Sequence, residues 1–528
     1  MNTCFPLMKF LCLGMVTWCL IQGCRTNNHL QAPDGEVMYH VVQRSFYDSD
    51  GDLHGDLNGL KGQLDYLQEL GVTSILLLPL YESVFYHNYF PTDFKTIDPE
   101  FGTMEDYVAL VREIHRRGMK LYMDMEVQYV TEDHLWYRDA LNNPASEYTD
   151  YILWKDSLNQ QPSSIIFDLD GLLGYDGEYR RITTLNMRSD KVLDYATNLF
   201  RFFADPNGDG EFSDGVDGFR LDHMMDHLDY KPELTDLFNK FWSPLIEDLK
   251  TFNPDLIFMA EQAEWASFGE AYLKEADVDW IFGFRLGFGI RNFDKKQITE
   301  SLDSMMHILE PFDGAKNHIV FIANHDVERY STSVDDDPGK LRVGAALNLL
   351  LPGVPSIYYG QEIGMRGSGG QYGPTDGNEI PVREAFEWYA DTTGRGIAMW
   401  YRNTGPWWDD SRLRPYDGIS LEEQRADPGS LWNHYKQLIQ IRKKYPEFQS
   451  GTYRNIQNDR ENVFSFLREL GENRSLVLVN LSDTTVEASE HFPLNRWRCV
   501  FGHVSERYDE ETGKIQLQPN EVLIFRYE

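Results

Sequence analysis

The chain has 528 residues, of which 84 are acidic and 49 basic, so its formal net charge at pH 7 is −35. This charge argues against nucleic acids as partners, because binding a polyphosphate depends on clustered lysine and arginine. Hydrophobic residues make up 42% of the sequence and aromatic residues 14%, which excludes a disordered chain and predicts a large globular core.

The N-terminal segment has the character of an export signal. Lys9 precedes the apolar run Phe10 to Ile21, which is too short to span a bilayer. The stretch Leu20-Ile21-Gln22-Gly23-Cys24 resembles a bacterial lipobox, in which the cysteine is lipidated and becomes the first mature residue. We therefore expect a signal peptide over residues 1–24, a polar tether over 25–36, and a lipid anchor at Cys24 that holds the protein in the bacterial cell envelope. A cleaved signal without lipid is the alternative.

The next four hundred residues have the pattern of repeated βα units, in which short apolar runs alternate with longer helical patterns. Helices are predicted at Leu57–Leu70, Met104–Arg117, Pro232–Phe252, Leu341–Leu351 and Leu431–Tyr445. Eight strands are predicted, at Val37–Gln43, Ser74–Leu78, Lys120–Val127, Gly218–Asp222, Leu256–Ala260, Asp279–Phe284, Ile319–Ala323 and Ser356–Tyr359. Eight parallel strands close a barrel, so we expect an α/β fold, a (β/α)8 TIM barrel over residues 37–447.

Two intervals interrupt this rhythm. Residues 128–189, after the third strand, predict an inserted subdomain above the barrel mouth. Gly360–Ser430 is rich in glycine and aromatic residues and predicts a long functional loop. From residue 448 to 528 short alternating runs separated by turn residues predict a small antiparallel β domain.

Three acidic residues stand at the predicted ends of strands four, five and seven: Asp222, Glu261 and Asp326. The C-terminal ends of barrel strands converge on one mouth, so these side chains are expected to face one cavity. Arg220 and His325 are their natural charge partners. A single acidic residue here is equally well explained as a helix cap, but three of them are harder to reach by chance.

These residue types match the needs of one reaction. Cleavage of a glycosidic bond requires a carboxylate nucleophile, a second carboxyl group that protonates the leaving oxygen, and negative charge beside an oxocarbenium-like transition state. The three acids supply all of these. The fourteen histidines show no paired ligand spacing that would indicate a catalytic transition metal. His223 and His227 are interpreted as ordinary loop or helix-start residues, with a place in the lining of the cleft as the alternative.

From about Val37 to the C-terminus the sequence resembles the α-amylase family of retaining glycosidases, glycoside hydrolase family 13. The segments that carry the resemblance are Gly218-Phe219-Arg220-Leu221-Asp222, Met259-Ala260-Glu261, Asn324-His325-Asp326, Tyr86-His87-Asn88-Tyr89 and Pro352 to Glu362. The resemblance implies that Asp222 is the nucleophile, Glu261 the general acid/base and Asp326 the stabiliser of the transition state.

The same resemblance implies four substrate-binding residues. Arg220 would keep the nucleophile ionised, His325 and His87 would contact the cleaved sugar, and Tyr89 would be its stacking platform, with a packed core tyrosine as the alternative for Tyr89. It also implies that the insertion is a domain B and that the C-terminal domain is a β-sandwich.

One segment departs from the family pattern. Where the family usually has Asn-His after the third strand, this chain has Gln128-Tyr129. In the family that asparagine often binds calcium and that histidine contacts the sugar. The departure puts both functions in doubt, since tyrosine donates one hydrogen bond but cannot carry the positive charge of histidine.

Two acidic loops have the alternating oxygen ligands and glycine that suit calcium. A metal-free turn rich in aspartate is the alternative for both. The candidate ligands are Asp48, Asp50, Asp52 and Asp56 in the first loop, and Asp205, Asn207, Asp209 and Asp214 in the second. Bound calcium would be structural.

Together these features predict an exported retaining glycosidase that hydrolyses α-glucosidic bonds in starch, maltodextrin or related α-glucans. Two alternatives remain open. The glucosyl-enzyme could pass its sugar to another sugar, as in a transglycosidase or isomerising enzyme, or the barrel could be a non-catalytic glycan-binding protein. The sequence leaves the oligomeric state open.

Overall fold

The computed structural model describes residues 35–312, 314–458, 460–489, 496–504, 507–509 and 514–528. The predicted signal peptide, Cys24 and nearly all of the tether lie outside the described residues. No helix within these ranges is both long enough and apolar enough to cross a membrane.

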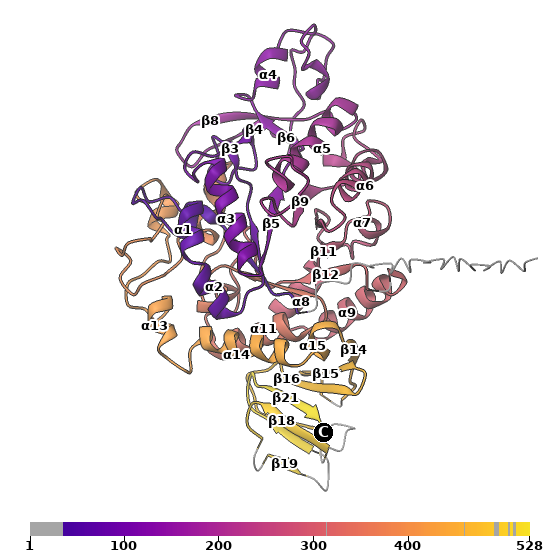
Figure 1. Cartoon of the computed structure of the whole chain (residues 1–528). Helices are drawn as coiled ribbons and strands as arrows, with labels where there is room; N and C mark the ends of the chain where they lie inside the picture. The colour runs from indigo at the N-terminus through magenta and orange to yellow at the C-terminus, as the bar shows by residue number, and fades with distance from the viewer. Residues whose placement is uncertain (1–34, 313, 459, 490–495, 505–506, 510–513) are drawn as a thin grey trace, which may run out of the picture.

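Eight parallel strands close into a barrel in the order β1-β13-β12-β11-β10-β9-β5-β2. Figure 1 labels four of these strands, β5, β9, β11 and β12. All eight predicted strands are confirmed, with ends that differ by a few residues. They are β1 (Met38–Val41), β2 (Ser74–Leu77), β5 (Lys120–Met125), β9 (Gly218–Met224), β10 (Ile257–Gln262), β11 (Trp280–Phe282), β12 (Asn317–Val320) and β13 (Val354–Tyr358).

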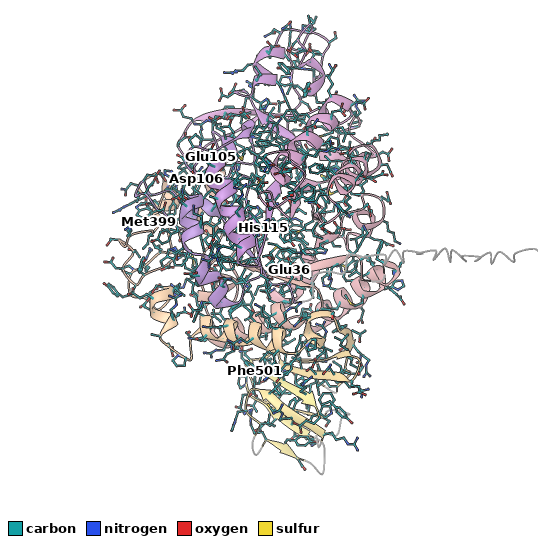
Figure 2. All side chains as sticks on the ribbon, in the orientation of Figure 1. Glu36, Glu105, Asp106, His115, Met399 and Phe501 are labelled. Carbon is teal, nitrogen blue, oxygen red and sulfur yellow. The ribbon has the colours of Figure 1, made fainter. Side chains whose placement is uncertain are left out.

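The helices lie around the outside of the barrel. Those between and after the strands are α1 (Leu57–Gly62), α2 (Leu64–Leu70), α3 (Met104–Arg116), α5 (Asp190–Ala204), α6 (Ser243–Phe252), α7 (Glu270–Lys274), α8 (Phe284–Arg291), α9 (Lys295–Leu309), α10 (Tyr330–Ser333), α11 (Pro338–Leu350) and α14 (Leu431–Lys444). In α3, Glu105 and Asp106 occupy the first turn and His115 the last, where their charges suit the helix dipole (Figure 2). Thr103 and Asp106 form a capping box that begins this helix.

Two predicted helices are corrected. The helix expected at Leu57–Leu70 is broken at Gln63 into α1 and α2. Gly59 is required in α1, because a Cβ atom there would lie 2.0 Å from the carbonyl oxygen of Tyr47. The helix expected at Pro232–Phe252 begins only at Phe238, with a π-helical turn before α6. Asp236, with a φ of 61°, interrupts any helical path before it.

The inserted segment and the long loop both lie over the barrel. Within residues 128–189 a small sheet has the order β6-β8-β7, from Tyr129–Thr131, Tyr179–Thr184 and Gly171–Leu173, beside α4 (Leu135–Ala140). A hairpin of β3 (Tyr81–Ser83) and β4 (Pro91–Ile97) follows β2. The loop after β13 contains α12 (Pro406–Asp409) and α13 (Leu421–Arg425) and buries an aromatic cluster that includes Trp400, Tyr401 and Trp407.

The C-terminal part is an antiparallel β-sandwich, which confirms the predicted β domain. After α15 (Glu447–Ser450) the chain forms a five-stranded sheet, β14-β15-β16-β21-β18, and a three-stranded sheet, β17-β20-β19, that share one apolar core. The other face of the larger sheet, with Phe466 and Val477, belongs to the barrel core. The strands are β14 (Thr452–Asn455), β15 (Val463–Leu470), β16 (Asn473–Asn480), β17 (Val486–Ser489), β18 (Trp497–Phe501), β19 (Tyr508–Asp509), β20 (Lys514–Leu517) and β21 (Val522–Tyr527).

Candidate active site

Strand register brings the predicted residues to one end of the barrel. Asp124 on β5 lies directly beside Arg220 on β9, and Asp222 follows two residues later on the same face. The pairing of β9 with β10 shifts register between Ala260 and Gln262, which places Glu261 at the irregularity. Such shifts re-aim a side chain, and here that side chain is a predicted catalytic acid.

These side chains line a cavity of about 350 Å³ at the barrel mouth. The sequence predicted seven catalytic and substrate-binding residues. Six of them line the cavity: Asp222, Glu261, Asp326, Tyr89, His87 and His325. The inserted segment contributes Ile166 and Leu172 to the wall, and the loop after β13 contributes Thr375, Asp376, Glu379 and Arg383.

The seventh, Arg220, is fully buried beneath the cavity and links the acidic groups. Its Nη1 donates to Asp222 Oδ1 at 2.6 Å and also to Asp124, while Nη2 lies 3.0 Å from Glu261 Oε2. Asp222 and Glu261 therefore contact opposite nitrogens of one guanidinium group. An inverting glycosidase spaces its two carboxyl groups by roughly 6.5–9.5 Å to admit a water molecule, and a pair bridged in this way suits direct displacement instead.

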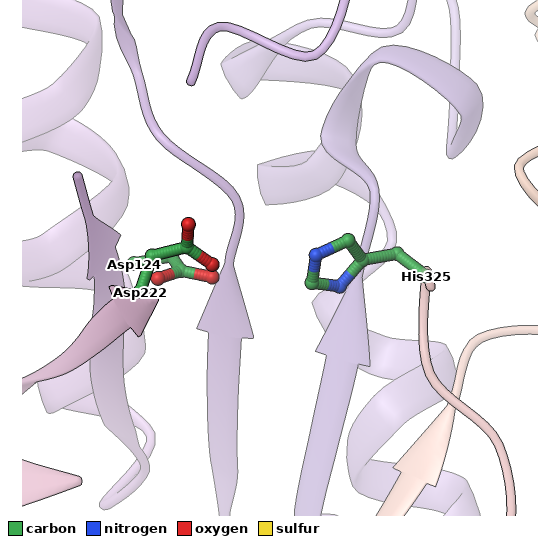
Figure 3. A group of neighbouring side chains, drawn as sticks. All are labelled: Asp124, Asp222 and His325. Atoms are coloured by element: carbon green, nitrogen blue, oxygen red, sulfur yellow. The ribbon is translucent and has the colours of Figure 1, made fainter. Parts of the chain in front are cut away.

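Tyr89 and His325 form the facing wall. The Tyr89 hydroxyl donates to Asp124 Oδ2 at 2.8 Å and lies 2.8 Å from His325 Nε2. A tyrosine hydroxyl has one proton to donate, so His325 carries its proton on Nε2. Figure 3 shows the carboxyl groups of Asp124 and Asp222 together, with the ring of His325 facing them across the barrel.

Asp326 has its own cation. Arg383 Nη2 lies 3.2 Å from Asp326 Oδ1, and Arg383 Nε donates to the carbonyl oxygen of His325 at 2.9 Å. His325 Nε2 lies 3.1 Å from the other carboxylate oxygen of Asp326. The third predicted acid is thus held apart from the Arg220 cluster by a residue of the loop after β13.

The carboxyl groups differ in proton affinity. Burial raises the pKa of Asp222 well above its usual value against the opposing charge of Arg220. Burial and the charge of Glu261 raise the pKa of Asp326 to about 7. For Glu261, burial also acts to raise the pKa, but the charge of Arg220 and the backbone N–H of His223 outweigh it and lower the pKa. Burial lowers the pKa of His325, so its ring is neutral.

Of the two interpretations of His223, the structure supports the one in which it lines the cleft. His223 is part of β9, lines the cavity, and donates its backbone N–H to Glu261 Oε2 at 3.0 Å. Its φ of 43° lies in the left-handed region, which is costly for a residue with a side chain. His227 does bond within its own loop, to the carbonyl oxygen of Lys231 at 2.9 Å.

Gln128 and Tyr129 do not reproduce the ligands of the family pattern. The Gln128 side chain donates through Nε2 to the carbonyl oxygens of Asp222 and His223, at 2.6 and 3.2 Å. An amide N–H donor in that position cannot ligate a cation, so these residues do not fit a calcium ion there. The Tyr129 hydroxyl donates to the carboxylate of Asp229, at 2.8 and 2.9 Å from its two oxygens.

The two acidic loops differ in structure. Ligand atoms of Asp48, Asp50 and Asp56 all lie within 4.8 Å of one another, whereas Asp52 is exposed and accepts from the backbone of His54. In the second loop the Asn207 amide donates to Asp209 and to Asp214, at 2.9 and 2.8 Å. Arg112 further pairs with Asp214 at 3.2 Å, and Asp205 accepts from the backbone of Gly208 and Gly210.

Sequence reasoning missed several residues of the site, among them Glu126, which lines the cavity beside the predicted acids. Asp124 could have been found, because it lies near the C-terminal end of the third predicted strand, as Asp222 does in the fourth. Arg383, Asp376 and Glu379 lie in the long loop after β13, which has no periodicity from which to place a side chain. Both carboxylate oxygens of Asp376 are buried, and burial raises its pKa to about 7.

A closed (β/α)8 barrel with paired carboxyl groups and a buried arginine at its mouth defines a glycoside hydrolase. Residues 40–451 match the family described as "Alpha amylase, catalytic domain", and the chain belongs to the α-amylase family. It is 30% identical to Alpha-amylase 3 of Dictyoglomus thermophilum over 84% of each chain. It is 28% identical to the oligo-1,6-glucosidase of Parageobacillus thermoglucosidasius, over 93% of this chain and 98% of that one.

The fold is likewise similar to that of solved relatives. The α-amylase from H. orenii superposes with a TM-score of 0.77 and 27% identity, over 94% of this chain and 100% of that one. The predicted fold class and enzyme class are confirmed, and a non-catalytic role is not needed to explain a site that keeps all three acids.

Proposed function

We propose that Asp222 attacks the anomeric carbon of an α-glucoside while Glu261 protonates the leaving oxygen, and that water activated by Glu261 then releases the sugar. Asp326 stabilises the positive charge that develops on the ring. The observation that carries this assignment is the shared contact of Asp222 and Glu261 with Arg220. It makes the two carboxyl groups neighbours on one side of the cavity, as double displacement requires.

The proton must change places for this reaction. In the free site burial raises the pKa of Asp222 well above its usual value, whereas the pKa of Glu261 is lowered, despite burial, by the charge of Arg220. Displacement needs Asp222 ionised and Glu261 protonated. The proton therefore has to move from Asp222 to Glu261 when a sugar ring binds over Asp222. Arg220, which contacts both carboxyl groups, stabilises the nucleophile that is left ionised.

The charge of the cavity favours a neutral substrate. Six acidic residues line the cavity. Arg383 is the one basic residue, lysine or arginine, among the lining residues, and it is already paired with Asp326. The lining residues therefore offer no further lysine or arginine to pair with a phosphate or carboxylate group, and burying such a group without a partner is costly. A phosphorylated or carboxylated sugar is disfavoured. We infer that the substrate is an α-glucan or maltooligosaccharide without anionic groups, with Tyr89, His87 and His325 against the ring that is cleaved.

The test is to incubate the mature protein with starch, pullulan, maltooligosaccharides and isomaltose and to separate the products. Glucose or short maltooligosaccharides in amounts that match the bonds broken would support hydrolysis. Products longer than the substrate at high substrate concentration would instead identify the transglycosidase or isomerising alternative. Failure to cleave any of them would contradict the proposed function.

We also propose that calcium binds the first acidic loop. The three clustered carboxylates of Asp48, Asp50 and Asp56 supply the hard oxygen ligands that Ca²⁺ prefers. In the second loop the Asn207 amide and Arg112 already neutralise Asp214, so the proposal is confined to the first loop. The ion would be structural, since Asp48 and Asp56 accept from backbone N–H groups of the loop itself.

Chelation is expected to lower the melting temperature by a few degrees. This is roughly the shift expected when the protein loses the stabilisation given by a ligand present at 100 times its dissociation constant. Added calcium should restore it. Asp50→Asn, which replaces an exposed ligand, should melt at the temperature of the chelated protein and no longer respond to chelator; Asn207→Ala in the second loop should respond like the wild type. An unchanged melting temperature on chelation would contradict the calcium site.

We propose lipid anchoring at Cys24 and a location in the bacterial cell envelope, at the periplasmic face or the cell surface. The support is the run of Lys9, the apolar segment Phe10 to Ile21, and the lipobox-like Leu20 to Cys24. The wild-type protein expressed in bacteria should incorporate an alkyne fatty acid and sediment with membranes. Cys24→Ser should abolish both, and a labelled Cys24→Ser protein would contradict the anchor.

A further inference from the structure

The peptide group between Asp222 and His223 connects the two proposed catalytic residues. Its carbonyl oxygen accepts from the Gln128 amide at 2.6 Å, and its N–H donates to Glu261 Oε2 at 3.0 Å. We propose that Gln128 and Tyr129 are positioning residues that hold this peptide and, through it, align the Glu261 carboxyl group. The inference rests on the proposed function, because it assigns a role in that reaction.

The contacts of Gln128 leave one orientation for its amide. Oε1 accepts from the Val127 backbone N–H at 2.8 Å, while Nε2 faces the carbonyl oxygens of Asp222 and His223. The reverse assignment would set an oxygen against two oxygens. The side chain is 1% exposed, so these hydrogen bonds do not compete with water and an unpaired group there would be costly.

The peptide needs such support because His223 is strained. A left-handed φ of 43° is costly for a residue other than glycine. Gln128 binds the carbonyl oxygens on both sides of His223, and the imidazole is held separately, with Nε2 lying 3.0 Å from Asp229 Oδ1. The surroundings therefore hold His223 by its backbone and by its ring.

Tyr129 acts on the ring side. Its hydroxyl donates to Asp229, whose nearly inaccessible carboxylate also accepts from Lys231 Nζ at 2.6 Å. Asp229 and Tyr230 themselves have positive φ values of 50° and 56°, so this loop keeps its shape only while the Asp229 contacts persist. The two residues that depart from the family pattern thus converge on His223, one through its carbonyl and the other through its side chain.

The consequence for Glu261 is specific. The His223 N–H is one of the groups that lower the pKa of Glu261, and it fixes one oxygen of the carboxyl group while Trp265 Nε1 lies 3.3 Å from the other. Loss of the Gln128 and Tyr129 contacts leaves Asp222 bound to Arg220. Glu261 keeps Arg220 and Trp265 as neighbours but loses the His223 N–H that sets the orientation of its carboxyl group. Protonation of the leaving group should therefore suffer more than nucleophilic attack.

The experiment compares two substrates in Gln128→Met, which keeps the side-chain length and removes the donor. With an unactivated maltooligosaccharide, kcat/KM should fall about 100-fold, the lower end of what a positioned general acid contributes. With a dinitrophenyl α-glucoside, whose leaving group needs no proton, it should fall less than about tenfold on the same reasoning. The pH limb assigned to Glu261 should move to higher pH, because a hydrogen bond that favours its ionised form is lost.

The matched control is Gln424→Met. The Gln424 amide makes the same kinds of contact far from the cavity, donating to the carbonyl oxygens of Ile363 and Gly418 and accepting from the Trp432 N–H. Gln424→Met should lower the melting temperature without changing the ratio of the kcat/KM values for the two substrates. The same measurement on Gln128→Glu and Tyr129→Phe ensures that the result does not depend on the folding of one variant. Tyr129→Phe should show a smaller difference between the two substrates, in the same direction.

The outcomes separate two failures. If folded Gln128 variants lose equal activity on both substrates, or none, the positioning role is refuted while the proposed function stands. If the wild type cleaves neither substrate, the proposed function itself has failed.

Discussion

Asp222→Asn is expected to lower kcat on a maltooligosaccharide by at least about 10⁴-fold, since it replaces the nucleophilic carboxylate with a neutral amide that cannot form the covalent intermediate. The neutral amide is almost the same size, and Arg220 keeps Asp124 and Glu261 as partners. We therefore expect the barrel to stay folded. Burial already raises the pKa of Asp222 well above its usual value, so a neutral amide suits this position and the melting temperature should change little.

The measurement is steady-state hydrolysis together with a thermal melt. Asp279→Asn is the matched control, because Asp279 is also buried and bound to a cation, Lys250 Nζ at 2.6 Å, but lies just before β11, at the opposite end of the barrel. It should lose stability and keep kcat. Full activity in Asp222→Asn would remove the proposed mechanism.

Replacement of Glu261 should separate the two steps of the reaction. Glu261→Gln cannot donate a proton to the leaving oxygen, so turnover of an unactivated maltooligosaccharide should fall by about 10² to 10⁴-fold. A dinitrophenyl α-glucoside should still form the intermediate quickly and then stall, giving a burst of phenolate. The stall arises because no general base is left to activate water.

A small nucleophile provides the second readout. Glu261→Ala opens space beside the intermediate, and azide needs no base, so azide should accelerate turnover and yield α-glucosyl azide. The α configuration follows from two successive displacements. The matched control is Glu447→Gln, since Glu447 is fully buried and bound to Ser475 and Arg526 between the barrel and the sandwich. A β-azide product, or no burst, would contradict the acid/base role of Glu261.

The positions of the proposed catalytic acids were accessible from the sequence because each lies at or beyond the end of a strand that can be predicted by itself. The apolar alternation of Gly218–Asp222 shows which side chains share a face, and the barrel rule then places that face at the mouth. The same rule extends to Asp124, although its pairing with Arg220 depends on the register of β5 against β9.

The residues that were missed or misjudged obey no such rule. Arg383 contacts Asp326 from a loop of irregular backbone. The role of His223 depends on a left-handed φ that the neighbouring sequence does not predict. Gln128 was visible only as a departure from a pattern. Its role as a donor follows only from the folded structure, in which its amide lies against the carbonyl oxygens of two residues nearly a hundred positions away.

By itself, then, the sequence determined the eight-stranded barrel, the acids at its mouth, the inserted segment and the terminal β domain. These follow from the period of apolar side chains, which is a local property of the chain. The tertiary structure decided which cation holds which acid, how Glu261 is oriented, and how the cavity is closed. Those features depend on loops that meet only after the barrel has closed. They cannot be predicted from the sequence, because hydrogen bonds between distant segments produce no periodic pattern in either segment.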